Sequence, residues 1–227
     1  MSDYISNIVK KPWGYEYLTY QNDFVALWLL HIKYTHSTSL HCHSKKTTGL
    51  FVISGEVEVS FFNNTSRLGP GDKIMIRKGL FHSTKAISEK GAYVLEIETP
   101  VDKHDLIRFR DSYGREGKPY EDESFETPKP EDYIWIEDPS KGKAHHIPFR
   151  DSILHVVSIP DINIFKNTGD TPNVIFLRGG IQASYGGYVA GPGDIVSLNT
   201  IQQLIEVFDK LDPNTITLTV NAFPTWI

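Results

Sequence analysis

The chain has 227 residues, of which 40% are hydrophobic and 12% aromatic, and its formal net charge at pH 7 is -5. This length is enough for one or two domains with a buried core. A negative net charge without a dense Lys/Arg block argues against a nucleic-acid or anionic-membrane surface. The longest apolar run, residues 24–30, is far shorter than the roughly 20 residues that a transmembrane helix needs. We therefore expect neither nucleic acid nor a membrane as a partner.

The N-terminal residues 1–4 do not combine a basic segment with an apolar one, so we expect no signal peptide. The chain has one cysteine, Cys42, which excludes an internal disulfide and fits a reducing compartment. Both observations favour a cytoplasmic protein.

Short hydrophobic runs separated by Gly, Asn and Pro predict one strand after another from residue 24 onward. Residues 57–59 alternate with period two, which is typical of a half-buried strand. Residues 201–211 fit either a short helix or a strand, and we expect a strand because the corresponding part of the first half is one. This pattern predicts an all-β sandwich or barrel. The strands are expected at residues 24–33, 49–60, 73–76, 92–98, 153–159, 174–177, 195–198 and 215–220.

Residues 121–132 hold six acids, two prolines and one lysine, a composition with little to bury. They predict a linker or surface arm between two β domains. We therefore expect a first domain at residues 1–115, an acidic linker or arm at 116–145, and a second domain at 146–227.

The second half of the chain repeats part of the first. The turn sequence Gly-Pro-Gly-Asp occurs at residues 69–72 and again at 191–194, an offset of 122. The strand at 51–55 resembles residues 175–179 at an offset of 124, and the difference of two fits within the hairpin loop between the two matches. Two matches in order indicate a duplicated β unit, and a period this long favours two similar domains over a solenoid.

Two histidines, His41 and His43, are the first candidate metal ligands. Residues two apart on a strand face the same side and lie roughly 6.6 Å apart, so both imidazoles can bind one ion at about 2.0–2.1 Å. Cys42 between them faces the opposite side and is not counted as a ligand. His82, which follows the Gly-Pro-Gly-Asp turn, is the best-placed third ligand. The pair alone is also compatible with hydrogen-bonded or solvent-facing histidines.

These residues, with Gly55, Gly71 and Gly79, resemble the two-part signature of the cupin superfamily. The resemblance implies two cupin-like (jelly-roll) β-barrels in one chain. Two positions depart from the signature: Thr48 stands where a glutamate ligand is usual, and Arg77 stands where a proline is usual. At the offsets of the repeat, the second unit has Phe165, Asn167, Pro172 and Leu204 opposite His41, His43, Thr48 and His82. The second barrel is therefore expected to be degenerate and without this site.

The chain most resembles the cupin domain of type II mannose-6-phosphate isomerases and related sugar-nucleotide proteins of polysaccharide biosynthesis. Residues 11–14, Lys-Pro-Trp-Gly, resemble the opening of that domain, and residues 97–100 and 105–115 resemble its ending. The resemblance covers about residues 10–115. It implies a small-molecule partner, a sugar phosphate or a nucleotide sugar, and a homodimer.

The resemblance also implies one divalent transition metal held by His41, His43 and His82, with zinc, iron, nickel and manganese as candidates. Three neutral imidazoles suit zinc, iron, nickel or copper better than a hard ion that prefers oxygen donors. Such a site leaves a position open for water or substrate. The alternative is that Thr48 marks a site that has decayed.

For a phosphosugar isomerase, the resemblance implies an ion that polarises the substrate oxygens and a base that moves a proton. Lys33 aligns with a lysine of the isomerase-like domains, and Arg115 is a candidate phosphate or transition-state contact. Glu96 is the candidate base, although Glu98 fits the sequence equally well. The expected catalytic residues are Lys33, Arg115 and Glu96, and the expected substrate-binding residues are Lys46, Arg77 and Thr48.

Three functions remain open from the sequence. The first is a metal-dependent isomerase or epimerase acting on a phosphorylated or nucleotide-activated sugar. The second is a non-catalytic sugar-binding or regulatory bicupin, prompted by Thr48 and by the second unit. The third is a three-histidine iron dioxygenase, prompted by the absence of a glutamate ligand.

Overall fold

The computed structural model describes residues 7–118, 125–126, 133–167 and 173–222. The chain divides into two compact units, residues 1–135 and 136–227. We describe each unit by itself. The boundary lies inside the segment 116–145 that the sequence predicted as a linker, of which residues 119–124 and 127–132 lie outside the described part.

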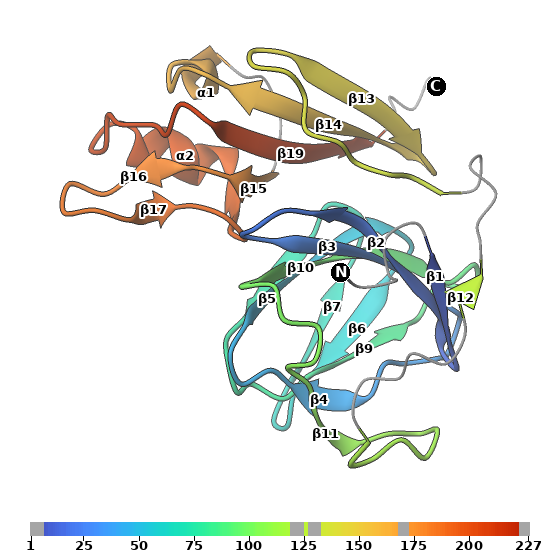
Figure 1. The fold of residues 1–227 in the computed structure, drawn as a ribbon. Coiled ribbons are helices and arrows are strands. Elements are labelled where there is room, and N and C mark those ends of the chain that lie inside the picture. The colour runs from blue at the N-terminus through green and yellow to red at the C-terminus, as the bar shows by residue number, and fades with distance from the viewer. Residues whose placement is uncertain (1–6, 119–124, 127–132, 168–172, 223–227) are drawn as a thin grey trace. The chain divides into compact units, whose positions relative to one another are not determined.

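The first unit is built almost entirely of strands (Figure 1). Seven of them form one antiparallel sheet in the order β12-β1-β2-β3-β10-β5-β8. The strands of this sheet are β1 (Ile8–Lys11), β2 (Gly14–Gln21), β3 (Ala26–Ile32), β5 (Thr47–Ser54), β8 (Lys73–Ile76), β10 (Ala92–Thr99) and β12 (Phe125–Glu126). The short strand β12 comes from the acidic segment and pairs with β1, so part of that segment belongs to the first unit.

A second layer closes the barrel of the first unit. It combines a three-stranded sheet, β7-β6-β9, with a two-stranded sheet, β11-β4. Isolated bridges, His41 to His82 and Ser37 to Lys85, join the β4 side of this layer to the β9 side. Its strands are β4 (Leu40–Cys42), β6 (Val57–Ser60), β7 (Thr65–Leu68), β9 (Ser83–Ala86) and β11 (Ile107–Arg110).

Alternation along these strands places apolar side chains between the two layers. On β6, Val57 and Val59 are fully buried whereas Glu58 and Ser60 are partly exposed, as the period-two pattern predicted. They pack in one core with residues of β3, β5 and β10, including Trp28, Val52 and Val94. Burial on this scale is the main stabilising contribution to the barrel.

The second unit contains a five-stranded antiparallel sheet in the order β13-β14-β19-β15-β18, a two-stranded sheet, β16-β17, and two short helices. Its elements are β13 (Ala144–Phe149), β14 (Ser152–Ile159), α1 (Ile164–Asn167), β15 (Asn173–Arg178), β16 (Ile181–Gln182), β17 (Tyr188–Ala190), β18 (Ile195–Ser197), α2 (Leu198–Leu204) and β19 (Thr215–Ala222).

The structure confirms the internal repeat. The order β13-β14-β19-β15-β18 reproduces β2-β3-β10-β5-β8 of the first unit, strand for strand along the chain. The two Gly-Pro-Gly-Asp turns also make matching backbone bonds. The N–H of Val52 donates to the carbonyl of Asp72 and the N–H of Phe176 donates to the carbonyl of Asp194, both at 3.0 Å. Two units with one strand order and one turn geometry support the prediction of an all-β, duplicated fold.

Residues 201–211 do not form the expected strand. Residues 198–204 form helix α2, which Ser197 caps by accepting a hydrogen bond from the N–H of Thr200 at 3.2 Å. Helix α1 lies at the place in the chain that β4 occupies in the first unit. The two helices pack together, with Phe165 of α1 only 3% exposed in the core that also contains Ile201. An apolar helical face therefore stands where the first unit carries its histidines, which fits a degenerate second barrel.

Candidate metal centre and its pocket

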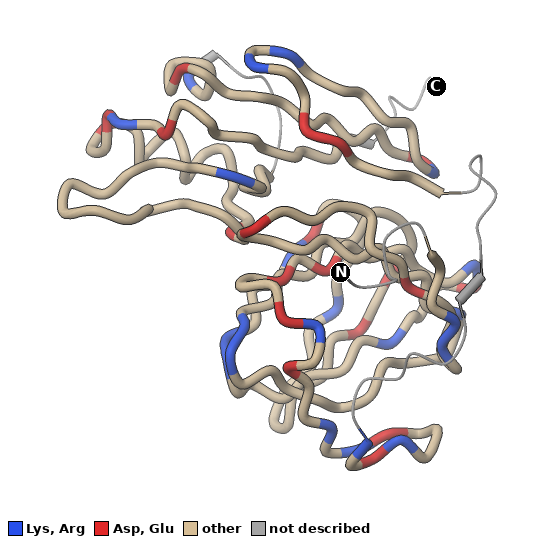
Figure 2. Tube along the Cα trace, in the orientation of Figure 1, with Lys and Arg blue, Asp and Glu red and all other residues tan. Residues whose placement is uncertain are grey.

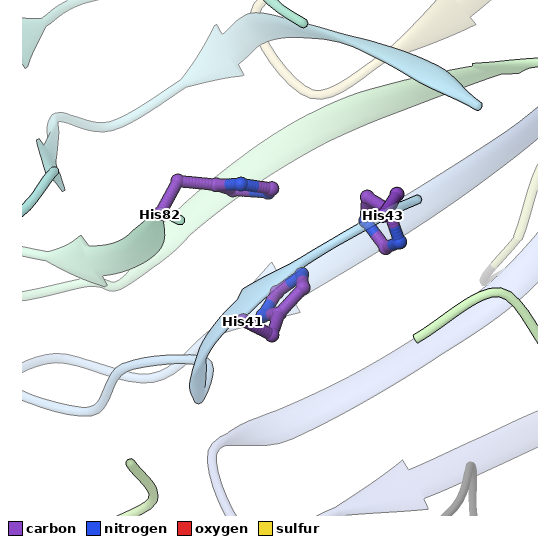
Figure 3. A group of neighbouring side chains, drawn as sticks. All are labelled: His41, His43 and His82. Atoms are coloured by element: carbon purple, nitrogen blue, oxygen red, sulfur yellow. The ribbon is translucent and has the colours of Figure 1, made fainter. Parts of the chain in front are cut away.

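Three histidines meet inside the first barrel. His41 lies on β4, His43 follows the end of that strand, and His82 immediately precedes β9. The backbone N–H and carbonyl of His41 exchange hydrogen bonds with those of His82 at 3.0 and 2.8 Å, which fixes the two chain segments side by side. One possible ligand atom from each of the three lies within 4.8 Å of the others, and all three residues are buried. Figure 3 shows the rings directed toward a common space.

Each histidine uses its Nδ1 atom to bind the backbone. The Nδ1 atoms of His41, His43 and His82 lie 2.8, 2.5 and 3.0 Å from the carbonyl oxygens of Ser39, Asp105 and Leu80. A carbonyl only accepts, so Nδ1 donates and Nε2 keeps a free lone pair in the neutral ring. The Nε2 atom of His43 is buried without a hydrogen-bond partner among the described residues. In metal-binding histidines, one ring nitrogen usually donates a hydrogen bond that fixes the ring, and the other nitrogen is free to bind the metal ion.

All three imidazoles are held neutral. Burial, together with the nearby ammonium group of Lys46, lowers the pKa of His43 to about 3 and that of His82 to about 4. Burial lowers the pKa of His41 well below its ordinary value, and the other two imidazoles add to the effect. A charged ring would be buried beside other cationic groups. Neutral imidazole is the form that binds a metal ion.

Asp105 positions the loop that follows His43. Its carboxylate accepts hydrogen bonds from the backbone N–H groups of Ser44, Lys45 and Lys46 at 2.9, 2.7 and 3.0 Å, and from the Ser44 hydroxyl at 2.7 Å. Burial raises the pKa of Asp105, but these hydrogen bonds outweigh it and keep the pKa below the usual range. One residue thus fixes the His43 ring through its carbonyl and turns the chain toward Lys46 through its side chain.

Thr48 and Glu98 occupy facing positions in the barrel. They are Cα partners on the antiparallel strands β5 and β10, so their side chains lie on the same face of the sheet. Thr48 is 0% exposed, and its hydroxyl has no hydrogen-bond partner among the described residues. Glu98 is 1% exposed, and its Oε2 atom likewise has none. A carboxylate thus lies across the strand pair from the threonine that replaces the usual glutamate.

Lys46 holds this carboxylate. Its Nζ atom lies 2.5 Å from Oε1 of Glu98, and both side chains are at least 98% buried. Lys46 also lowers the pKa of each of the three histidines, so its charge acts on the candidate metal centre as well as on Glu98. The ion pair links the histidine cluster to β10.

A second carboxylate, Glu96, lies two residues before Glu98 and faces the same pocket. Burial and the negative charge of Glu98 raise the pKa of Glu96 to about 7, against the opposing effect of Lys103 and Lys46. Lys103 bonds Glu16 at 3.1 Å and lies 3.5 Å over the ring of Trp28. The two carboxylates of β10 therefore differ: one is ion-paired, and the other titrates near neutrality.

His41, His43 and these charged groups line one pocket that is partly open to solvent. Basic and acidic positions are interspersed through the first unit (Figure 2). Arg115 is fixed at the pocket by Asp111, with Nε and Nη2 at 3.0 and 2.6 Å from the two carboxylate oxygens. The charged residues that line the pocket are Lys11, Glu16, Lys46, Glu96, Glu98, Lys103, Arg108 and Arg115.

The structure brings most, but not all, of the predicted site residues together. His41, His43, Lys46, Glu96 and Arg115 line the pocket, and His82 completes the histidine cluster. Lys33 and Arg77 are exposed and are not among the described residues that line it. Sequence reasoning did not single out Lys11, Glu16, Lys103 or Arg108, because each reaches the pocket only through long-range packing.

A closed antiparallel barrel with three inward-facing, backbone-oriented histidines defines a β-barrel protein with a candidate metal centre. Residues 28–98 match the family model described as "Cupin domain", a segment that contains all three histidines. The structure is similar to that of KdgF from Halomonas sp., at 16% identity and a TM-score of 0.40, over 44% of this chain and 94% of that one.

Two further similar structures are described as sugar phosphate isomerases. A putative one from Acidithiobacillus ferrooxidans is 21% identical over 35% of this chain and 52% of that one, with a TM-score of 0.33. One from Silicibacter pomeroyi is 16% identical over 34% of this chain and 52% of that one, also with a TM-score of 0.33. This chain therefore spans about half the length of each, and likeness at this level does not indicate an activity.

No curated protein matches the sequence. Among the described residues, no helix has the length and apolar character needed to cross a membrane.

Proposed function

We propose that the first unit is a metal-dependent isomerase or epimerase acting on a phosphorylated or nucleotide-activated sugar. One observation carries the proposal: two histidines of the three-histidine cluster, His41 and His43, line a pocket together with two carboxylates that are in different electrostatic environments. Two such carboxylates beside a candidate metal centre are suited to moving a proton between neighbouring carbons.

His41, His43 and His82 fit a divalent transition metal. Their Nδ1 atoms are bonded to backbone carbonyls, and the buried Nε2 atom of His43 has no protein partner among the described residues. The donor set is three neutral nitrogens, which suits zinc, iron or nickel better than magnesium or calcium. When bound, such an ion would act as a Lewis acid on adjacent hydroxyl and carbonyl oxygens of the substrate.

The pocket favours an anionic ligand. Five basic and three acidic side chains line it. With the pKa of Glu96 near 7, part of the negative charge is neutralised at physiological pH, so the balance becomes more positive. Arg115 is kept in place by its two bonds to Asp111 and lies at the pocket wall. A planar guanidinium is well suited to a phosphate, as the resemblance of residues 105–115 to isomerase endings also suggests.

We assign Glu96 as the proton-transfer group. In its ionised form it would take the proton from the hydroxyl-bearing carbon next to the substrate carbonyl and return it to the former carbonyl carbon, while the hydroxyl proton passes to the former carbonyl oxygen. Substrate and product thus keep the same composition, and no co-reactant is needed. Glu98, which is fixed by Lys46, would remain a negative charge that keeps Glu96 basic.

A His82→Ala variant tests the metal centre and the activity together. We expect the native protein to contain close to one transition-metal ion per chain more than the variant, because two ligands bind such ions far more weakly than three. Elemental analysis gives the metal content, and a panel of hexose phosphates and nucleotide sugars gives the turnover. His104→Ala, at an exposed position, is the control and should keep both. Native protein that is metal-free and inert on the panel would contradict the proposal.

A Glu96→Gln variant tests the assignment of the base. We expect kcat to fall by roughly 10²–10⁴-fold, the usual contribution of a positioned base, with the metal content unchanged. In the native enzyme, kcat/KM should rise as the pH passes through about 7, where Glu96 loses its proton. Glu56→Gln is the control, since that carboxylate pairs with Arg67 on the surface. A variant of Glu96 with native kcat and an unchanged pH profile would refute the assignment.

A non-catalytic sugar-binding role is the second candidate, and the absence of a carboxylate at Thr48 favours it. Sugar binding that survives a His41→Ala/His43→Ala double substitution, without turnover of any substrate in the panel, would select this role. Oxygen consumption by the iron-loaded protein would instead point to a dioxygenase.

A further inference from the structure

A second pair of imidazoles meets on the second unit, in a place that the candidate metal centre does not involve. His146 on β13 and His155 on β14 are directly opposite in the antiparallel register. Their Nδ1 atoms lie 2.6 Å apart, and their ring centroids are 4.8 Å apart. His145 and His146 are adjacent on a strand and therefore face opposite sides, so the sequence alone does not indicate a partner for His146. The pairing across the hairpin appears only in the fold.

The pair is accessible and chemically suited to a metal ion. Strand β13 is at the edge of the five-stranded sheet, and His146 is exposed while His155 is half-buried. Two nitrogens bound side by side to one ion at 2.0–2.1 Å lie about 3 Å apart. The rings would therefore need to separate by only a few tenths of an ångström. Burial and the neighbouring His146 lower the pKa of His155, which favours the neutral, metal-binding form of its imidazole.

A third donor lies on the same face of this sheet. Asn221 on β19 pairs with Ile153, two residues from His155, and the register between β14 and β19 is continuous. The side-chain Oδ1 atom of Asn221 is buried and has no hydrogen-bond partner among the described residues. Asn221 thus offers an oxygen donor on the face of the sheet that carries the histidine pair.

We propose that His146 and His155 form a second metal site, which takes a borderline divalent ion of the Ni²⁺ or Cu²⁺ type at the edge of the second unit. Imidazole ligands with open positions for water suit these ions, and affinity rises along the series toward copper. The site would tie β13 to β14, and it does not depend on the function proposed for the first unit. Because only the native hairpin brings the two rings together, bound ion would also stabilise the fold.

Equilibrium dialysis of the full chain against Ni²⁺ tests this site. We expect two equivalents bound by the native protein, one by His146→Gln, and one by His82→Ala. His145→Gln is the matched control, because His145 is the adjacent residue on the opposite face of β13, and it should keep two equivalents. His146 is exposed, so its substitution should leave the fold intact, and circular dichroism checks this.

The pattern of losses separates this proposal from that for the first unit. Loss of one equivalent in His82→Ala but none in His146→Gln would refute the second site and leave the first intact. Loss in His146→Gln alone would support the second site and count against the metal centre of the first unit. Line broadening by Ni²⁺ in NMR spectra gives an independent readout: it should be strongest at His146 and His155 in the His82→Ala protein, and broadening elsewhere would overturn the proposal.

Discussion

Replacing Lys46 by methionine should lower the free energy of unfolding by roughly 3–5 kcal/mol, the usual cost of removing one partner of a buried ion pair. Lys46 and Glu98 are both at least 98% buried and lie 2.5 Å apart. Without the ammonium, the carboxylate of Glu98 would be left in the barrel with one oxygen that already lacks a partner among the described residues. Urea unfolding measures the change.

A double variant, Lys46→Met/Glu98→Leu, should recover most of the lost stability, because it removes both charges and fills the space with apolar atoms. Arg67→Met is the control. Arg67 pairs with Glu56 on the surface, where solvent screens the interaction, and we expect no measurable change. If Lys46→Met behaves like Arg67→Met, the ion pair is not formed as described.

Lys46→Met, which we expect to be less stable, should nevertheless bind a metal ion more tightly. The charge of Lys46 lowers the pKa of His41, His43 and His82, so it disfavours any added positive charge at these rings. Removing that charge should tighten the binding of a divalent ion, whereas Glu98→Gln should weaken it by leaving the ammonium uncompensated.

The fold was largely predictable because its signals are local. The apolar strands and the repeated Gly-Pro-Gly-Asp turn can be read from neighbouring residues, and the matching sheet orders of the two units agree with them. Helix α2 was missed because the corresponding segment of the first unit is a strand. The comparison of the two halves of the sequence does not take account of the Ser197 cap or of the core that contains Ile201 and Phe165, which stabilise the helix.

The candidate site was predictable only in part. The two-residue spacing of His41 and His43 places both rings on one face, so their convergence follows from strand geometry. The partner of Lys46 could not be read from the sequence, because Glu98 is 52 residues away and meets it only through the pairing of β5 with β10. Similarly, the exposed positions of Lys33 and Arg77 depend on where the turns direct them.

Acid should begin to destabilise the metal-free protein below about pH 6.5, before most of its carboxylates take up protons. In the unfolded chain His41, His43 and His82 take up protons near their ordinary pKa of 6.5. In the folded chain they stay neutral, because burial holds the pKa of His82 at about 4 and that of His43 at about 3. Below pH 6.5 the unfolded state therefore binds more protons, and stability falls by up to about 1.4 kcal/mol per pH unit for each histidine.

Glu96 has the opposite effect on folding stability over nearly the same pH range. Its pKa is raised to about 7, so the folded state takes up this proton first, and the stability associated with it is present at low pH and lost as the pH rises through 7. For these four groups of the first unit, three histidines against one carboxylate leave a net excess of two protons on the unfolded chain between about pH 6 and 4.5. The net slope should then be roughly 2.7 kcal/mol per pH unit.

Urea unfolding at a series of pH values, with a chelator present, measures this slope. His82→Gln should reduce it by up to about 1.4 kcal/mol per pH unit, and Glu96→Gln should make it steeper because the opposing proton is lost. His104→Gln, at an exposed position, should leave it unchanged. A native slope near zero, or a His82→Gln slope equal to the native one, would show that the imidazoles are not held neutral in the barrel. The neutrality that makes these rings available to a metal ion would then be absent as well.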